Sequence, residues 1–203
     1  ALHPKMIAIQ LSPHHIDIYS KTDDCLLKYA TTISIGCKTI VDFCFIGPIN
    51  KVSQICVLTE EFSDPPQLKV ITINTQNWLY DDPSHPKLFL SKNPFSYIIF
   101  PIDPEHSSIV GVLSSSQCLR VTYSNFQLHS TSATICTQDK ILNLDLLSGD
   151  VYCYVDEAGN YGKVEIQKEG NVHFEALGKV DCPSKIVSLT HNMVFLMSHE
   201  NTS

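Results

Sequence analysis

The chain contains 203 residues, of which 43% are hydrophobic and 17% are charged, and this hydrophobic content can bury a substantial core, which excludes a disordered tail. Its 14 basic and 21 acidic residues give a formal net charge of −7, and the basic residues are scattered along the chain. Because tracking a phosphate backbone normally takes a clustered positive surface, the charge pattern argues against direct nucleic-acid binding.

Short strand-like runs fill the chain from one end to the other, and turn-forming breakers such as Gly47-Pro48, Asp64-Pro65-Pro66 and Gly159-Asn160 separate them. No segment has a convincing helical period, so the sequence predicts an all-β fold. The predicted strands, in chain order, cover residues 6–11, 16–19, 26–34, 38–46, 53–59, 68–75, 87–90, 97–101, 108–113, 118–123, 133–137, 141–147, 151–156, 162–167, 172–177, 185–190 and 193–198.

Several of these strands are apolar on both faces. Residues 38–46 place Val41, Phe43 and Phe45 on one face, and only Asp42 interrupts the apolar residues of the other. Residues 141–157 form two apolar strand-like runs joined by a Ser-Gly-Asp turn, and residues 151–155 place Val and Cys on one face and two Tyr on the other. Strands of a sandwich usually expose one polar face, whereas propeller blades stack face to face and cover their central strands on both sides. The pattern therefore favours a β-propeller.

Grouping the strands in fours predicts an arc of about four WD40-like blades of four antiparallel strands, an incomplete ring. Residues 1–36 are interpreted as the end of one blade and 184–203 as the start of another. Between them we expect a blade over 37–92, an irregular blade over 95–130 and a blade over 131–180, with a strand at 133–137 inside the last.

The two ends of the chain point to a longer protein. The sequence begins at Ala1 without Met and stops at Ser203 directly after a strand-like run. The N-terminus lacks the regions of a signal peptide, and no apolar run approaches the roughly 18 residues that a membrane helix needs. We expect a piece of a larger protein that is neither exported nor inserted in a membrane.

Most of the eight cysteines lie in or beside apolar strand runs, where a free thiol behaves as a small hydrophobic side chain. We expect buried, reduced thiols, as in a cytosolic or nuclear protein, rather than a disulfide scaffold. These cysteines are Cys37, Cys44, Cys56, Cys118, Cys136 and Cys153.

The sequence has no motif for catalysis, cofactor binding or metal binding that rises above its structural alternative. The Ser114-Ser115-Ser116 run lacks the glycines and the helix of a nucleophile elbow, and the His14-His15 pair is typical of a solvated turn. Asp81, Asp82 and His85 could bind a cation, but acidic residues in a turn more commonly cap or solvate the loop. We predict a protein that is not an enzyme and has no cofactor, while a propeller hydrolase or lectin stays an alternative that these last three residues would serve.

Trp78 and Tyr80 are the best candidates for contact with a partner protein. They follow a predicted strand and lie beside an acidic, proline-rich loop. Aromatic side chains supply much of the binding energy of protein interfaces, although packing beneath the loop is the alternative role.

Several segments, taken in order, resemble one family of large nuclear propeller proteins. The family comprises the large subunit of damaged-DNA-binding protein, the large subunit of the cleavage and polyadenylation specificity factor, and subunit 3 of splicing factor 3b. The segments are His3 to Ile9, Ile40 to Ile46, Gln54 to Leu58, Leu68 to Ile73, Ile98 to Pro101, Val110 to Tyr123, Leu144 to Tyr154 and Leu177 to Leu196. The chain departs from the family at Ser198-His199-Glu200 and at Glu105-His106-Ser107, where glycine-bearing turns are usual, so it resembles a divergent member.

The resemblance implies a nuclear scaffold, also present in the cytoplasm, of which this chain is part of the first propeller. The segments at 40–46 and 144–154 look most like the damaged-DNA-binding branch, whose members act as adaptors of cullin-4-type ubiquitin ligases. Their partners are ligase subunits and substrate receptors, and nucleic acid is reached through those partners. The alternative within the family is a scaffold of pre-mRNA 3′-end processing or splicing.

Overall fold

The structure is a computed structural model that describes residues 2–3, 5–47, 52–81, 87–90, 93–94, 97–102, 109–114, 117–125, 127–134, 139–166, 172–190 and 193–198. Over these residues the chain is all-β, as predicted, and contains no α-helix. No helix long and apolar enough to cross a membrane occurs in the described part of the chain. The strands are β1 (Leu2–His3), β2 (Met6–Ser12), β3 (His15–Lys21), β4 (Leu27–Ser34), β5 (Thr39–Ile46), β6 (Val52–Glu60), β7 (Gln67–Asn74), β8 (Lys87–Phe89), β9 (Ile98–Ile102), β10 (Ile109–Ser114), β11 (Gln117–Ser124), β12 (Gln127–Thr134), β13 (Ile141–Ser148), β14 (Val151–Asp156), β15 (Asn160–Ile166), β16 (Val172–Lys179), β17 (Pro183–Thr190) and β18 (Met193–Ser198).

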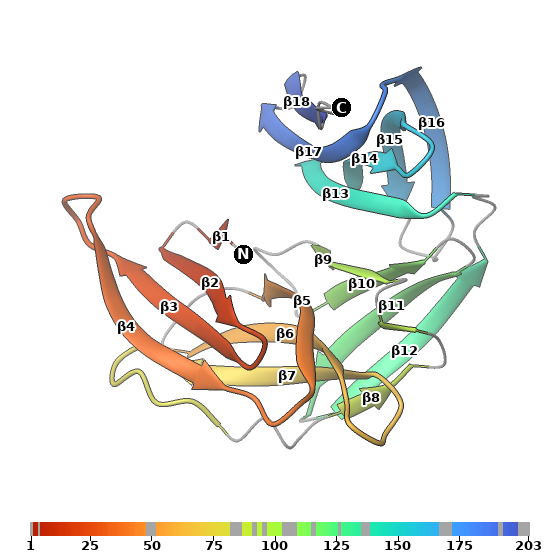
Figure 1. Cartoon of the computed structure of the whole chain (residues 1–203). Coiled ribbons are helices and arrows are strands. Elements are labelled where there is room, and N and C mark those ends of the chain that lie inside the picture. Colours follow the sequence, from red (N-terminus) through yellow and green to blue (C-terminus); the bar gives the residue numbers. More distant parts are fainter. Residues whose placement is uncertain are drawn as a thin grey trace, which may run out of the picture. The chain divides into compact units, whose positions relative to one another are not determined.

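Most of these strands form four-stranded sheets in which neighbours in the chain are neighbours in the sheet (Figure 1). The sheets are β1–β4 (sheet A), β5–β8 (sheet B), β9–β12 (sheet C) and β13–β16 (sheet D). A two-stranded sheet, β17–β18, follows as sheet E. The pairs whose register is known run antiparallel, as expected when short turns join successive strands.

The chain divides into two compact units. The first comprises Ala1–Phe95, Pro101–Val110 and Thr122–His129, and the second comprises Ser96–Phe100, Gly111–Val121 and Ser130–Ser203. Sheets A and B lie in the first unit and sheets D and E in the second, while sheet C contributes residues to both.

In the first unit, one face of sheet A packs on one face of sheet B. Alternate residues of β2 and β3, such as Met6, Ala8 and Ile18, are buried against Ile55 and Ile71 of sheet B. Burying each large aliphatic side chain contributes about 1.5–3 kcal/mol. This shared apolar layer holds the two sheets together.

In the second unit, the strand β14 of sheet D is covered on both faces. On one face, Cys153 and Val155 pack with Ile186 of β17, and the cluster extends to Val194 and Leu196 of β18. On the other face, the ring of Tyr152 meets the ring of Phe100 edge-on, with ring centroids 4.9 Å apart.

Burial changes systematically across each sheet. In β7 the residues from Gln67 to Ile71 are all buried, and in β14 only Val151 is partly exposed. In contrast, β4 and β16, the last strands of their sheets, are largely exposed. The prediction that central strands are covered on both faces is therefore confirmed for β7 and β14.

The hairpin predicted at 141–157 is confirmed as β13 and β14. Gly149 lies at the first position of its two-residue turn with a φ of 55°, the left-handed region that favours glycine in hairpin turns. The next turn is held by Asp156, whose carboxylate accepts hydrogen bonds from the backbone and the side chain of Asn160 at 2.8 and 2.9 Å.

Sheet C differs from the prediction. Its last strand, β12, was not predicted, because its only large apolar side chain is Leu128 and its remaining residues are polar or small. Ala133 and Thr134 belong to the end of β12 and not to the following sheet, so their assignment to the blade over 131–180 is wrong. An outer strand needs little apolar surface, and hydrophobic pattern alone does not reveal it.

Tight packing at one position also depends on glycine. A Cβ atom on Gly111 of β10 would lie 2.1 Å from Cζ of the neighbouring Phe100. Because the Phe100 ring is also in contact with Tyr152, the sequence needs glycine here to admit the ring.

Candidate functional site

The structure places the two predicted interface aromatics against the core of the first unit. Trp78 and Tyr80 are partly buried and pack on the layer between sheets A and B. The Tyr80 hydroxyl accepts a hydrogen bond of 3.2 Å from the backbone N–H of Ser34. Trp78 has a φ of 60° in a loop where its N–H donates to the carbonyl of Asn74 at 2.8 Å. Both residues help to close sheet A on sheet B, and their contact with a partner stays a prediction.

The polar residues considered as chemical sites are accounted for by local structure or lie outside the described residues. Ser12 Oγ and His15 Nδ1 are 2.6 Å apart, and the rings of His14 and His15 meet edge-on. Asp82 and His85 are outside the described residues, so the candidate cation site that they form with Asp81 is untested. Among the described residues, no three His, Cys, Asp or Glu side chains are grouped so that they could hold a metal ion.

Sheet A has one face that faces away from sheet B and carries exposed apolar side chains. On β2, Met6 and Ala8 point into the core, so Ile9 and Leu11 lie on the opposite face. Pairing brings Tyr19 of β3 beside Ile7 and beside Tyr29 of β4. We call this surface the Tyr29 face, formed by Ile9, Leu11, Tyr19, Leu27 and Tyr29.

The Tyr29 face combines exposed apolar area with a fixed polar network. The exposed fractions of Leu11, Tyr29 and Leu27 are 65%, 54% and 52%. The rings of Tyr19 and Tyr29 meet edge-on with centroids 5.9 Å apart. Thr32 donates a 2.6 Å hydrogen bond to the carboxylate of Asp17, so the 2.8 Å contact between the Tyr29 and Thr32 hydroxyls has Tyr29 as donor. Oriented aromatics on an apolar surface are typical of protein interfaces.

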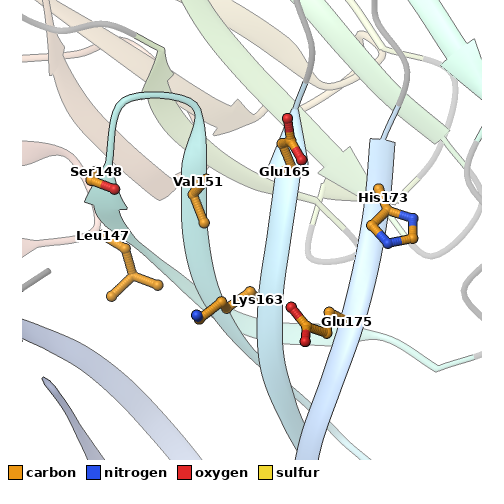
Figure 2. A pocket seen from close by; sticks show the side chains of 7 residues that line it. All are labelled: Leu147, Ser148, Val151, Lys163, Glu165, His173 and Glu175. Atoms are coloured by element: carbon orange, nitrogen blue, oxygen red, sulfur yellow. The ribbon is translucent and has the colours of Figure 1, made fainter. Parts of the chain in front are cut away.

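The second unit contains a pocket of about 300 Å³ on the face of sheet D that also contacts sheet E (Figure 2). Leu147 and Val151 supply an apolar wall from the β13–β14 hairpin. Ser148 of β13 and charged or polar side chains of β15 and β16 form the rest. The lining residues are Leu147, Ser148, Val151, Lys163, Glu165, His173 and Glu175.

Strand register sets the charge pattern of this pocket. Lys163 lies directly opposite Glu175, and Glu165 lies directly opposite His173, so each acidic residue has a nitrogen-bearing residue across the strand pair. Glu165 and Glu175 are diagonal neighbours on one face, within reach of one long side chain. None of these four side chains forms an ion pair or hydrogen bond with another residue that the structure describes.

One polar group that the sequence did not single out lies inside the first unit. Lys69 of β7, on the same face as Ile71, donates to Glu61 at 2.6 Å, and the two side chains are only 4% and 10% exposed. Thr59 donates a second hydrogen bond to the same carboxylate. The sequence does contain a signal for this buried ion pair, which is a lysine within the apolar run Leu-Lys-Val-Ile. A lysine that is buried requires a partner.

No protein-family model matches the chain, and a comparison with curated proteins finds no match. The fold and the two surfaces described above are therefore the physical basis for a functional proposal.

Proposed function

We propose that the chain is an arc of WD40-like β-propeller blades that acts as a protein scaffold. Three features of the fold support the propeller. Neighbours in the chain are neighbours in each four-stranded sheet, and sheets A, B and D are antiparallel. The sheets of each unit pack face to face, and burial falls from the second strand of a sheet to its last. Radially arranged blades have these properties, since their inner strands are covered and their outer strands are not.

The observation that carries the scaffold role is the Tyr29 face. Leucine and tyrosine side chains rarely lie together on an open sheet face unless further protein covers them. Here Leu11, Leu27 and Tyr29 are each more than half exposed, and hydrogen bonds hold Tyr29 in place. Little side-chain entropy is lost when a partner binds to side chains that are already fixed.

For the partner, we propose subunits of a cullin-4-type ubiquitin ligase and its substrate receptors in the nucleus. The support is the resemblance of residues 40–46 and 144–154 to the adaptor branch of the family. The pre-mRNA processing branch would use the same kind of surface with other partners.

Affinity purification tests this proposal. The tagged protein, expressed at its natural length in nucleated cells, is captured from nuclear extract, and its partners are quantified by mass spectrometry. We expect cullin subunits in the wild-type sample and a loss of about tenfold or more in a Leu11→Asp/Tyr29→Ala variant, because interface anchors each contribute about 2 kcal/mol or more.

Phe62→Asp is the matched control, because Phe62 is 77% exposed but lies outside sheet A, so its partners should be unchanged. Recovery of RNA-processing subunits in place of cullin subunits would assign the protein to the other branch. A Tyr29-face variant that retains all partners would refute the proposed interface.

A further inference from the structure

Two of the buried cysteines lie directly opposite each other in sheet B. Cys44 of β5 pairs with Cys56 of β6, so the two side chains project from the same face of the sheet. Both are free thiols, and they are only 6% and 0% exposed. The pair is therefore an internal feature of one sheet.

The backbone around this pair sets the distance between the two residues. The carbonyl of Glu60 accepts a 2.8 Å hydrogen bond from the N–H of Lys38, so the backbone groups of Glu60 point toward β5. Because this direction alternates along a regular strand, those of Leu58 and Cys56 also point toward β5. Cys44 and Cys56 therefore form a hydrogen-bonded pair, in which the Cα atoms are about 5.5 Å apart.

A disulfide bond fits this separation. The Cα atoms of a disulfide usually lie about 4.4–6.8 Å apart, and most lie near 5.5–6 Å. The Cβ atoms of opposite residues are about 4.5–5.5 Å apart, which is more than the roughly 3.8 Å of a relaxed disulfide. The bond can therefore form without a change of register, but it would be strained. Strained disulfides are more easily reduced than relaxed ones.

The position of β5 gives an oxidant a route to the pair. β5 is the first strand of sheet B and lies at the edge of that sheet. Local opening takes less free energy at such an edge than in strands that are paired on both sides. Hydrogen peroxide is close to water in size, so a local separation of β5 from β6 admits it. Because a buried thiol is inert, the reaction is confined to this open state.

We propose that Cys44 and Cys56 form a redox-sensitive pair, which hydrogen peroxide converts reversibly to a disulfide that ties β5 to β6. The thiolate of one cysteine attacks peroxide, which gives a sulfenic acid and releases hydroxide. The thiol of the other cysteine then attacks the sulfenic sulfur, forms the S–S bond and releases water. The two thiols lose two electrons and two protons in total, and peroxide is reduced to water. This inference goes beyond the scaffold role and does not depend on it.

Peptide mapping by mass spectrometry tests the proposal on the full chain. A Cys25→Ser/Cys182→Ser background removes two exposed thiols that could join separate molecules. The folded protein is treated with dilute hydrogen peroxide, its remaining thiols are blocked with N-ethylmaleimide, and it is digested with pepsin. We expect a peptide pair joined through Cys44 and Cys56, two hydrogen atoms lighter than the separate peptides. Reduced glutathione, added after the peroxide is removed, should restore both thiols.

Cys153 is the matched control within the same molecule. It is 1% exposed, but it lies opposite Asp145 and Lys163 and not opposite another cysteine. It should remain a free thiol under the same treatment. In a Cys44→Ala variant, Cys56 should likewise remain free. Cross-links from either cysteine to other positions would show that unfolding brings the thiols together, and would overturn the proposal.

Hydrogen exchange measures whether the bond holds the strand. The amides of β5 should exchange about tenfold more slowly in the oxidised protein than in the reduced protein, because the bond suppresses the separation of β5 from β6. The absence of the cross-link, a cross-link that glutathione does not reduce, or unchanged exchange in β5 would each overturn the proposal. The Leu11→Asp/Tyr29→Ala variant should form the disulfide as the wild type does, so failure of the Tyr29 face and failure of this pair are distinguishable.

Discussion

At the scale of single residues, the cysteines show how burial controls chemistry. Five of the six thiols predicted to be buried are buried, and Cys136 lies outside the described residues. Loss of solvation is the main cause that raises the pKa of Cys37, Cys118 and Cys153 to about 11. Burial raises the pKa values of Cys44 and Cys56 further, and Asp42 adds to both shifts. The apolar runs around these residues were sufficient to predict them.

These thiols make the protein less stable at alkaline pH. In the unfolded chain a thiol ionises above about pH 8.5, whereas a buried thiol with a raised pKa stays protonated, so the unfolded state gains stability as pH rises. Each thiol should lower the free energy of unfolding by about 1.4 kcal/mol per pH unit between its unfolded and folded pKa values. Urea denaturation followed by tryptophan fluorescence from pH 7.5 to 10.5 measures this.

A Cys44→Ala/Cys56→Ala variant is the comparison for this effect. At pH 7.5 its free energy of unfolding should be lower than that of the wild type, because the removed sulfur atoms leave cavities. As the pH rises, its free energy of unfolding should fall less steeply than that of the wild type. Equal slopes would show that these two thiols do not govern alkaline stability.

At the scale of elements, Lys69 of β7 forms a buried ion pair with Glu61, the residue directly after β6. Lys69 and Glu61 are nearly inaccessible to solvent, and Thr59 supplies the carboxylate with a second donor. Taking two charges out of water is costly, so such a pair adds little net stability, but removal of one partner leaves an uncompensated buried charge.

Two adjacent glutamates allow a matched test of this pair. We expect Glu61→Gln to lower the free energy of unfolding by about 3 kcal/mol or more, since Lys69 is then buried without a counter-charge. Glu60→Gln breaks the neighbouring 2.8 Å pair with Lys38, which is exposed, and should cost less than about 1 kcal/mol. A Glu61→Leu/Lys69→Met variant should recover most of the loss. Denaturant unfolding measures all three, and equal costs for the two single changes would contradict a buried pair.

The strands also show which parts of the fold could be predicted from the sequence. Strands such as β5 and β14 were predicted because their sequences are apolar on both faces. A strand that is covered on both sides consists mainly of apolar residues. β12 was missed because an outer strand is defined by its backbone pairing with β11, which polar side chains do not reveal. Lys69 was not recognised because its partner Glu61 lies just beyond the end of β6 and not in a neighbouring strand.

At the scale of the whole molecule, the four-stranded sheets share a gradient of protection. Inner strands have paired neighbours on both edges, and β6, β7 and β14 are also covered on both faces, whereas β4, β12 and β16 are the last strands of their sheets. We expect native-state hydrogen exchange to be slowest in β6, β7 and β14 and faster by about two orders of magnitude or more in β4, β12 and β16. Mass spectrometry of peptic fragments resolves this, and uniform exchange within each sheet would contradict the gradient.

The open surfaces could not have been located from the sequence. Residues 6–11 carry apolar side chains on both faces of the strand. Their sequence alone does not indicate that Met6 and Ala8 point inward while Ile9 and Leu11 are exposed. That choice depends on which face sheet B covers, a contact between distant parts of the chain. The pocket of sheet D likewise depends on register, since only the pairing of β15 with β16 sets Glu165 and Glu175 on one diagonal.

The position of Trp78 has a practical consequence. It is the only tryptophan of the chain, and it packs on the layer between sheets A and B. The intrinsic emission of the protein is therefore a built-in label for the first unit. Changes in the emission spectrum will report on the packing of sheet A against sheet B. Binding at the pocket of sheet D would have to be followed with a separate probe.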